Sequence, residues 1–351
     1  MMLSIFNLLW EGRIRMMNLA QPTFRDILEA RKIICRYLPR TPLYTYPQLD
    51  QLLGAKIYVK HENHMPTGAF KVRGGINLIS HLTLEQKKRG VVTASTGNHA
   101  QSIAYACTLY EVPATIIMPE GANPVKVKAV RAFGGDIVFH GKIFDESRIY
   151  AEQLANQRGA RFIHPANEPY LLAGVATYAL EIFEEVPDLD VVIAPAGGGS
   201  GASGCCLVKK AICPSAQVIA VQAEKAPAAY LSWKMKRIVT DRVETAAEGL
   251  ATQVGYELTQ EIFREDLSDF VLVSEEEIAQ AILTYLELVR NLTEEAGAAP
   301  LAAALKIRDR LRGKKVALIL SGGNISLERL KTVLYTEDKG KSCYNELKFY
   351  R

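Results

Sequence analysis

The chain has 351 residues, of which 48% are hydrophobic and 23% charged, and its net charge is +4. That length is enough for two compact lobes with sizeable cores, and the composition is typical of ordinary globular proteins. Basic residues are spread along the chain without a long Lys/Arg block. The charge pattern therefore gives no support to a nucleic-acid or anionic-lipid partner.

No apolar run reaches the roughly 18–20 residues needed to span a bilayer, so we expect no membrane partner. Residues 1–18 mix apolar side chains with Glu11, Arg13 and Arg15, which predicts a loose or helical N-terminal extension and not a signal peptide. The six cysteines show no CxxC pair and no regular framework, which favours a reducing, cytoplasmic location.

Between residues 86 and 163, apolar runs alternate with helical patterns, and we expect this block to form a small domain. Strands that lack polar alternation and are separated by helices are typical of a parallel sheet covered on both faces. The expected strands are 90–94, 114–118, 136–139 and 161–163, and the expected helices are 98–110, a segment after Pro124, and 144–158.

The alternation continues on a larger scale, and we expect residues 19–85 and 164–335 to form a large domain. Residues 226–262 are less regular, and the polar tail 336–351 is expected to be loosely held. The sequence therefore predicts an α/β protein with two lobes, each built on a parallel sheet covered by helices. The further expected strands are 190–195, 217–223, 270–273 and 316–320.

Three polar or glycine-rich motifs lie just after predicted strands, namely Ser95–Asn98, Gly197–Gly201 and Ser321–Asn324. Doubly wound sheets place their ligands at the carboxyl ends of the strands. This shared placement predicts that the three motifs line one site.

Lys71 is the candidate reactive residue, in a run from His61 to Gly75 that places Phe70 before it and two glycines after it. Lysine amines form Schiff bases with carbonyl cofactors, and Phe70 offers a face for a flat ring. Most lysines are solvated surface charges, so this run needs the downstream motifs to support it.

The run Gly197–Gly201 can turn consecutive N–H groups inward as an anion nest, next to a helix N-terminus, and a phosphate is its natural guest. A tight strand–helix turn is one alternative. A dinucleotide fingerprint is another, with the G-x-G-x-x-G spacing of Gly199 to Gly204 and Glu224 as the acid for a ribose.

The other two motifs carry hydroxyl and amide groups. Ser95, Thr96 and the first amides of the following helix can bind a carboxylate, while Asn98 can donate to a ring hydroxylate. The alternative is that Ser95 or Thr96 caps that helix. Ser321 can place a hydroxyl against a heterocycle nitrogen, although by itself its motif is typical of an ordinary turn.

Together and in this order, the segments Gly-Ala-Phe-Lys-Val-Arg-Gly, Ser-Thr-Gly-Asn-His-Ala-Gln, Gly-Gly-Gly-Ser-Gly and Ser-Gly-Gly-Asn resemble the fold-type-II pyridoxal-phosphate enzymes. The resemblance is to the threonine/serine dehydratase and serine racemase group, and it runs from about residue 22 to 333. It implies a tryptophan synthase β-like fold and a homodimer.

The resemblance also implies roles for individual residues. Lys71 would bind pyridoxal phosphate as a Schiff base, with Phe70 beside the ring, Asn98 at its 3′ oxygen and Ser321 at its nitrogen. The phosphate would be bound by Gly197, Gly198, Gly199, Ser200 and Gly201. The substrate carboxylate would be bound by Ser95, Thr96, Gly97 and, as a helper, Arg148.

The reaction that the resemblance implies is β-elimination of a hydroxy amino acid, threonine or serine or a close relative, to a 2-oxo acid and ammonia. Lys71 would take the Cα proton. An amino-acid racemase is a second interpretation, because Thr96 stands where racemases use a serine and still has a hydroxyl. A nicotinamide-dependent oxidoreductase that uses the Gly199–Gly204 loop is an alternative from another class.

The sequence departs from the group at its cation site. Glu224 fits the metal-binding glutamate of the group, but Tyr230 stands where the group has an aspartate. We therefore expect no Mg or Ca site of that kind, while a monovalent cation stays open. The segment Glu294–Ala298 resembles the Glu-Pro-Ala-Gly-Ala of the group but lacks the proline.

Overall fold

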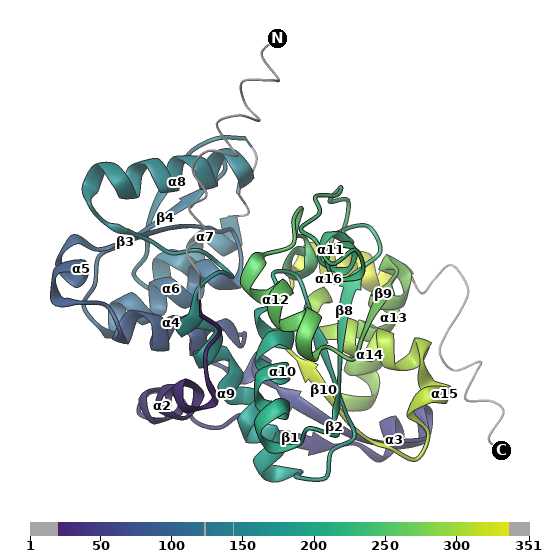
Figure 1. The fold of residues 1–351 in the computed structure, drawn as a ribbon. Helices are drawn as coiled ribbons and strands as arrows, with labels where there is room; N and C mark the ends of the chain where they lie inside the picture. The colour runs from purple at the N-terminus through teal and green to yellow at the C-terminus, as the bar shows by residue number, and fades with distance from the viewer. Residues whose placement is uncertain (1–19, 123, 143, 337–351) are drawn as a thin grey trace.

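The computed structural model describes residues 20–336, apart from residues 123 and 143. The helices and strands form two lobes side by side, each with a sheet of its own (Figure 1). The predicted α/β fold with parallel sheets and helices is confirmed. The N-terminal extension and the polar tail beyond residue 336 lie outside the described residues. Within the described ranges, none of the helices combines the length and the apolar character needed to cross a membrane.

The larger lobe contains a six-stranded sheet in the order β1-β2-β10-β7-β8-β9. Neighbouring strands are parallel, except that β1 pairs antiparallel with β2. Successive residues of β7 enter two different core clusters, so both faces of the sheet are covered. The strands are Leu43–Thr45 (β1), Lys56–His61 (β2), Val191–Pro195 (β7), Gln217–Ala223 (β8), Asp269–Val273 (β9) and Lys315–Leu320 (β10).

The smaller lobe contains a four-stranded parallel sheet in the order β5-β4-β3-β6. The strands predicted in both halves of the chain are confirmed. The domain boundaries predicted at residues 85 and 164 stay a prediction. The strands are Val91–Ala94 (β3), Ala114–Met118 (β4), Asp136–Phe139 (β5) and Arg161–Phe162 (β6).

Helices connect the strands and lie around both sheets (Figure 1). The three helices predicted near 98–110, after Pro124 and at 144–158 are α6, α7 and α8, while 226–262 holds short helical pieces between irregular stretches. The helices are Phe24–Ile34 (α2), Pro47–Leu53 (α3), Glu62–His64 (η1), Lys71–Ser80 (α4), Leu84–Arg89 (α5), Asn98–Leu109 (α6), Pro124–Ala132 (α7), Phe144–Arg158 (α8), Pro169–Glu185 (α9), Ser200–Ile212 (α10), Ala228–Lys234 (α11), Glu248–Leu250 (η2), Glu257–Asp266 (α12), Glu275–Thr284 (α13), Tyr285–Val289 (η3), Glu295–Lys306 (α14), Arg308–Leu311 (α15) and Leu327–Thr336 (α16).

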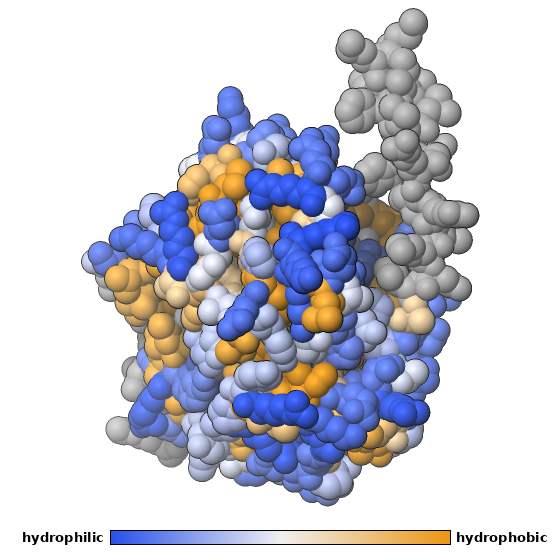
Figure 2. Space-filling model, turned by 90° about the vertical axis from the view of Figure 1, so that its left-hand side faces the viewer, coloured by the Kyte–Doolittle hydropathy of each residue, from blue (hydrophilic) through white to orange (hydrophobic). Residues whose placement is uncertain are grey.

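The outer face of the smaller lobe carries hydrophobic side chains dispersed among hydrophilic ones (Figure 2). Single exposed hydrophobic residues of this kind are normal on a protein surface and do not by themselves mark an interface. The exposed large hydrophobic residues on the elements of this lobe are Leu84, Leu109, Val125, Phe139 and Ile149.

Helix α4 begins at Lys71 and packs closely against α6 and α9, because glycines lie at the contacts. A Cβ on Gly75 would lie 2.4 Å from the hydroxyl oxygen of Ser102 on α6. On the other side, a Cβ on Gly174 of α9 would lie 2.6 Å from the carbonyl oxygen of Arg73. Both contacts are too short for any side chain, so the missing Cβ atoms allow α4 to be held between two helices.

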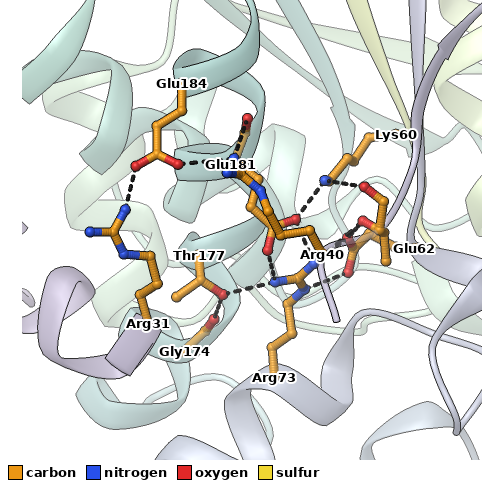
Figure 3. A network of polar contacts seen from close by, with 10 residues as sticks. Arg31, Arg40, Lys60, Glu62, Arg73, Gly174, Thr177, Glu181 and Glu184 are labelled. Atoms are coloured by element: carbon orange, nitrogen blue, oxygen red, sulfur yellow. Dashed lines mark hydrogen bonds and ion pairs between the residues drawn. The ribbon is translucent and has the colours of Figure 1, made fainter. Parts of the chain in front are cut away.

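A buried network of four charged side chains joins α4 to β2, η1 and α9 (Figure 3). Arg73 donates to both carboxylate oxygens of Glu62, at 2.8 and 2.9 Å, and to both of Glu181, at 2.7 and 2.9 Å. Lys60 donates to Glu181 at 2.6 Å, and the Thr41 hydroxyl donates to Glu62 at 2.6 Å. Two cations and two anions balance, and bidentate pairing of this kind is strong and geometrically specific.

We predict that loss of one charge from this network destabilises the fold far more than loss of a surface charge. Glu181→Gln leaves Arg73 with an uncompensated buried charge and should lower the free energy of unfolding by about 3–5 kcal/mol. Glu184 on the same helix pairs with Arg31 and Arg40 near the surface (Figure 3). Glu184→Gln should cost less than about 1 kcal/mol. Urea unfolding of the two variants measures the difference, and equal losses would contradict the prediction.

Candidate active site

The predicted motifs lie together around the first residue of α4. The Lys71 amine donates to the hydroxyl of Ser200, in the glycine-rich motif after β7, at 2.8 Å. The Asn98 side chain, in the motif after β3, accepts a hydrogen bond from Asn324, in the motif after β10, at 2.8 Å. The carboxyl ends of strands from both sheets therefore contribute to one site.

The Lys71 amine is partly buried and lies 5.2 Å from the centre of the Phe70 ring. Burial lowers the pKa of Lys71 from its usual 10.5 to about 8, because the charged form loses hydration. The uncharged amine is therefore far more populated near neutral pH than in an ordinary lysine, and it is the form that attacks a carbonyl carbon.

The backbone on both sides of the Lys71 side chain is anchored to other elements. The Lys71 carbonyl accepts a hydrogen bond from the Ser102 hydroxyl of α6 at 2.6 Å. The Phe70 N–H donates to the Ser321 carbonyl, just after β10, at 3.0 Å. The Phe70 ring packs edge-on against Tyr178 of α9, with 6.0 Å between ring centroids. The reactive side chain therefore starts from backbone held by three elements.

The loop Gly197–Gly201, between β7 and α10, has the backbone arrangement of an anion site. The hydroxyls of Thr252 and Thr259 donate to the carbonyls of its first two glycines at 3.2 and 3.0 Å, and Tyr178 donates to that of its last at 2.7 Å. Among the described residues, the N–H groups of 197–201 donate to no other group. Unpaired N–H groups that lead into a helix bind phosphate readily, so the loop fits that group.

Glycine is required at two positions of this loop. Gly199 has a φ of +86°, in the left-handed region that other residues rarely adopt. A Cβ on Gly197 would lie 2.2 Å from the carbonyl oxygen of Gly249, in η2. The loop is therefore packed too closely against η2 to accept a side chain at Gly197, and this contact leaves its backbone bare.

The Asn98 side chain has partners at both ends. Its Nδ2 donates to the Glu294 carboxylate at 2.6 Å, and its Oδ1 accepts from Asn324 Nδ2 at 2.8 Å. One N–H of Asn98 remains for a further acceptor, because a primary amide has two. Burial raises the pKa of Glu294 from 4.5 to about 7, against the opposing effect of the Asn98 hydrogen bond.

The segment Ser95–Gly97 caps α6 and has open space beside Gly97. Ser95 Oγ accepts from the N–H groups of Gly97 and Ala100 at 3.1 and 3.3 Å, which is the capping alternative considered for this motif. No heavy atom lies within 4 Å of the position that a Cβ on Gly97 would take. Thr96 and Gly97 are partly exposed, so this end of α6 is accessible to a ligand.

Arg148 lies on α8 and donates to Glu152 at 2.7 Å. The pKa of His164 is lowered to about 4, mainly by burial, and the positive charges of Arg148 and Lys71 lower it further. His164 Nδ1 accepts two backbone N–H groups of the following turn, at 2.9 and 3.0 Å. The proton of this neutral imidazole is therefore on Nε2, and Arg148 lies near enough to His164 to lower its pKa.

Ser321 is buried at the end of β10, with 2% of its surface exposed. In the part of the chain that the structure describes, its hydroxyl forms no hydrogen bond, while its backbone carbonyl binds Phe70. A hydroxyl beside Phe70 that no group of the described residues binds fits the nitrogen of a flat heterocycle. Together with the anion loop and the lowered pKa of the Lys71 amine, it gives the site the groups that pyridoxal phosphate requires.

Glu224 lies apart from these residues, at the end of β8. Its carboxylate accepts from the Lys306 amine at 3.1 Å. The same amine donates to the Leu272 carbonyl at 2.9 Å and to Glu277 at 3.0 Å. The positive charge beside Glu224 is thus supplied by a side chain of this protein.

Residues 34–322 match the family model described as pyridoxal-phosphate dependent enzyme. The chain belongs to this family. The predicted fold-type-II class is confirmed, and pyridoxal phosphate is the cofactor of the family to which these residues belong. Family membership replaces the nicotinamide interpretation of the glycine loop, in which Glu224 would have bound a ribose.

Several relatives of this pyridoxal-phosphate enzyme resemble it over most of their length. L-threonine ammonia-lyase of Thermotoga maritima is 41% identical over 315 residues, which cover 89% of this chain and 78% of that protein. A catabolic L-threonine dehydratase of Staphylococcus aureus is 38% identical over 314 residues, with 88% and 91% covered. The structure of maize serine racemase superposes with a TM-score of 0.85 at 33% identity, over 91% of this chain and 99% of that one.

Threonine deaminase isoform 2 of Solanum lycopersicum, in its processed form, superposes with a TM-score of 0.84 at 31% identity, over 90% of this chain and 95% of that one. The structural neighbours thus include both a deaminase and a racemase.

Sequence reasoning missed several residues that shape this site. Glu294 lies in the segment Glu294–Ala298, which was noted only for its resemblance to a family motif, and no role was predicted for Glu294. Ser102 and Tyr178 lie inside helices without any motif, and the contribution of Gly249 depends on a contact with a residue 52 positions earlier, Gly197. His164 stands before a proline, and the sequence around it carried no signal of a site.

We predict that the lowered pKa of Lys71 is visible when the apoenzyme takes up its cofactor. The initial rate at which the visible chromophore forms should rise with pH and level off above about pH 8, because the amine is then uncharged. An ordinary lysine analogue in the same buffers should keep gaining rate until about pH 10. Stopped-flow absorbance measures both profiles. An apoenzyme profile that follows the free analogue would contradict the prediction.

Proposed function

We propose that the chain is an L-threonine ammonia-lyase, which eliminates the β-hydroxyl of threonine and releases a 2-oxo acid and ammonia. The observation that carries the proposal is the position of the Lys71 amine, which donates to Ser200 in the anion loop and lies next to Phe70. Relatives that are 38–41% identical and carry the names L-threonine ammonia-lyase and L-threonine dehydratase support the choice of substrate. L-Serine is the second substrate that we expect.

The cofactor would be held by groups already described. The N–H groups of 197–201, including those of Gly198 and Gly199, would bind its phosphate, and Phe70 would pack beside its ring. Asn98 would donate its remaining N–H to the ring oxygen, and Ser321 would offer its hydroxyl to the ring nitrogen. When bound, pyridoxal phosphate supplies an electron-accepting ring that stabilises negative charge at the substrate Cα.

Lys71 and Ser321 set the course of the reaction. Lys71 would take the Cα proton, and burial lowers its pKa toward the working pH, as proton transfer requires. Ser321 offers a hydroxyl and not a carboxylate at the ring nitrogen, so the ring is not driven to its protonated form. Negative charge at Cα is then less stabilised, which favours prompt loss of the β-hydroxyl.

The substrate carboxylate would be bound at the open end of α6. Its donors would be the hydroxyls of Ser95 and Thr96 and those N–H groups of the first helical turn that do not bind Ser95, and the helix N-terminus favours its negative charge. Arg148, on α8, adds positive potential from the side of His164. These contacts orient Cα toward the Lys71 amine.

Racemisation of the same amino acids is a second candidate. It is supported by the likeness to maize serine racemase and by the hydroxyl of Thr96, which could return a proton to the opposite face of Cα. The methyl group of Thr96 crowds that face, so we rank elimination first.

The remaining predictions concern partners and location. We expect a homodimer in the cytoplasm that acts on a small amino acid. A monovalent cation near Glu224 stays a prediction. Since Lys306 already balances the charge of Glu224, we expect activity to depend only weakly on an added ion.

The purified holoenzyme tests the proposal with L-threonine, L-serine and L-threo-phenylserine. We expect 2-oxo acid and ammonia in equal amounts, with L-threonine the best substrate. Borohydride reduction should fix a phosphopyridoxyl group on Lys71, which mass analysis of the peptide locates. Lys71→Ala should lower the turnover by roughly a hundredfold to ten thousandfold, the range for loss of an acid–base group.

Lys56→Ala is the matched control, because Lys56 pairs with Asp50 at the surface. It should leave turnover unchanged. Release of the D-amino acid without oxo acid would move the assignment to a racemase, and a protein that takes up no pyridoxal phosphate would overturn the proposal.

A further inference from the structure

A chain of hydrogen bonds connects the two lobes beside the candidate cofactor position. It runs from the Thr67 carbonyl through Asn324 and Asn98 to the Glu294 carboxylate, with distances of 2.8, 2.8 and 2.6 Å. We propose that Glu294 is a positioning residue, which fixes the orientation of the Asn98 amide so that its second N–H faces the cofactor. The inference rests on the proposed binding of pyridoxal phosphate and assigns Glu294 a part in it.

The direction of this hydrogen-bond chain is fixed at both ends. The Thr67 carbonyl can only accept, so the Asn324 atom facing it must be the amide nitrogen. The same nitrogen donates to Asn98, and the Asn98 atom at that contact must therefore be the oxygen. Asn98 then presents its nitrogen to the Glu294 carboxylate, which can only accept when ionised. A flipped Asn98 amide would place two donors together at one end and two acceptors at the other.

Glu294 is itself rigidly placed between Asn98 and the Ser321–Gly322 turn. Its N–H donates to the Gly322 carbonyl at 3.1 Å, and its own carbonyl accepts from Ala298 in the first turn of α14 at 3.0 Å. A Cβ on Gly322 would lie 2.4 Å from the Glu294 carboxylate oxygen. Only glycine at this position leaves room for the carboxylate, so the turn that carries Ser321 is shaped around Glu294.

Among the described residues, Asn98 is the side chain that forms a hydrogen bond with the Glu294 carboxylate. The carboxylate lines a polar cavity together with Lys126, Glu248, Glu295 and Arg329. In the described part of the chain, these neighbours pair with one another, Lys126 with Glu248 and Arg329 with Glu295. The Asn98 hydrogen bond lowers the pKa of Glu294 against the effect of burial and so favours the accepting, ionised form.

A double-mutant cycle tests whether Glu294 acts through Asn98. The measured quantities are the dissociation constant of pyridoxal phosphate, from titration of the apoenzyme, and the position of the visible absorption band. Glu294→Ala should weaken cofactor binding by about three- to tenfold, the effect of one hydrogen bond, and shift the band. In an Asn98→Ala background, Glu294→Ala should change the dissociation constant by less than about twofold.

Glu294→Gln should restore both readouts, because its amide oxygen can still accept from Asn98. Glu295→Ala is the matched control: it removes a neighbouring carboxylate of the same cavity, whose partner is Arg329, and should leave the band in place. Fully additive effects of the Glu294 and Asn98 substitutions would overturn the inference. An unshifted band in Glu294→Ala would also overturn it.

Asn324→Asp provides a second variant if Glu294→Ala fails to fold. An aspartate cannot donate to either Thr67 or Asn98, so the other end of the chain is lost, and the band should shift as in Glu294→Ala. An unchanged band and affinity would count against the inference. A wild-type chain that takes up no cofactor overturns the proposed function as well, whereas normal uptake with additive effects overturns the inference alone.

Discussion

A buried guanidinium between two carboxylates is the constraint on which the site depends. The Arg73 guanidinium donates to both carboxylate oxygens of Glu62 and to both of Glu181. Lys60 completes the charge balance. Removal of any one partner leaves an uncompensated charge in the interior, so the four side chains stabilise the fold only as a complete set. Since Arg73 lies two residues after Lys71, the network fixes the first turn of α4 against β2 and α9, and with it the origin of the reactive side chain.

A fixed helix start explains how the lysine can be both buried and reactive. The amine has lost part of its hydration, and among the described residues its hydrogen-bond partner is the neutral hydroxyl of Ser200. The network keeps the buried carboxylates on Arg73 and away from this amine, so no anion raises its pKa again. The carboxylates that stabilise the fold therefore pair with Arg73, within one helical turn of Lys71, and do not pair with the Lys71 amine.

The strands and the reactive lysine could be predicted from the sequence because they depend on local patterns: apolar runs between helices, and motifs at strand ends. Strand β2 was missed because its buried face includes Lys60, a charge that no apolar pattern contains. Arg73 was quoted within the lysine motif, but its partner Glu181 is 108 residues away, and only the fold shows that they meet. Glu294 was missed for the same reason, since its contact with Asn98 spans 196 residues.

The most direct test of this account is amide hydrogen exchange at the start of α4. In the wild-type apoenzyme, the peptide covering residues 66–75 should exchange slowly, as the neighbouring α6 does. In Glu62→Gln, exchange in 66–75 should accelerate while α6 stays protected, because the network that holds the first turn has lost one partner. Unchanged protection of residues 66–75 in that variant would contradict the claim that the buried charges position Lys71.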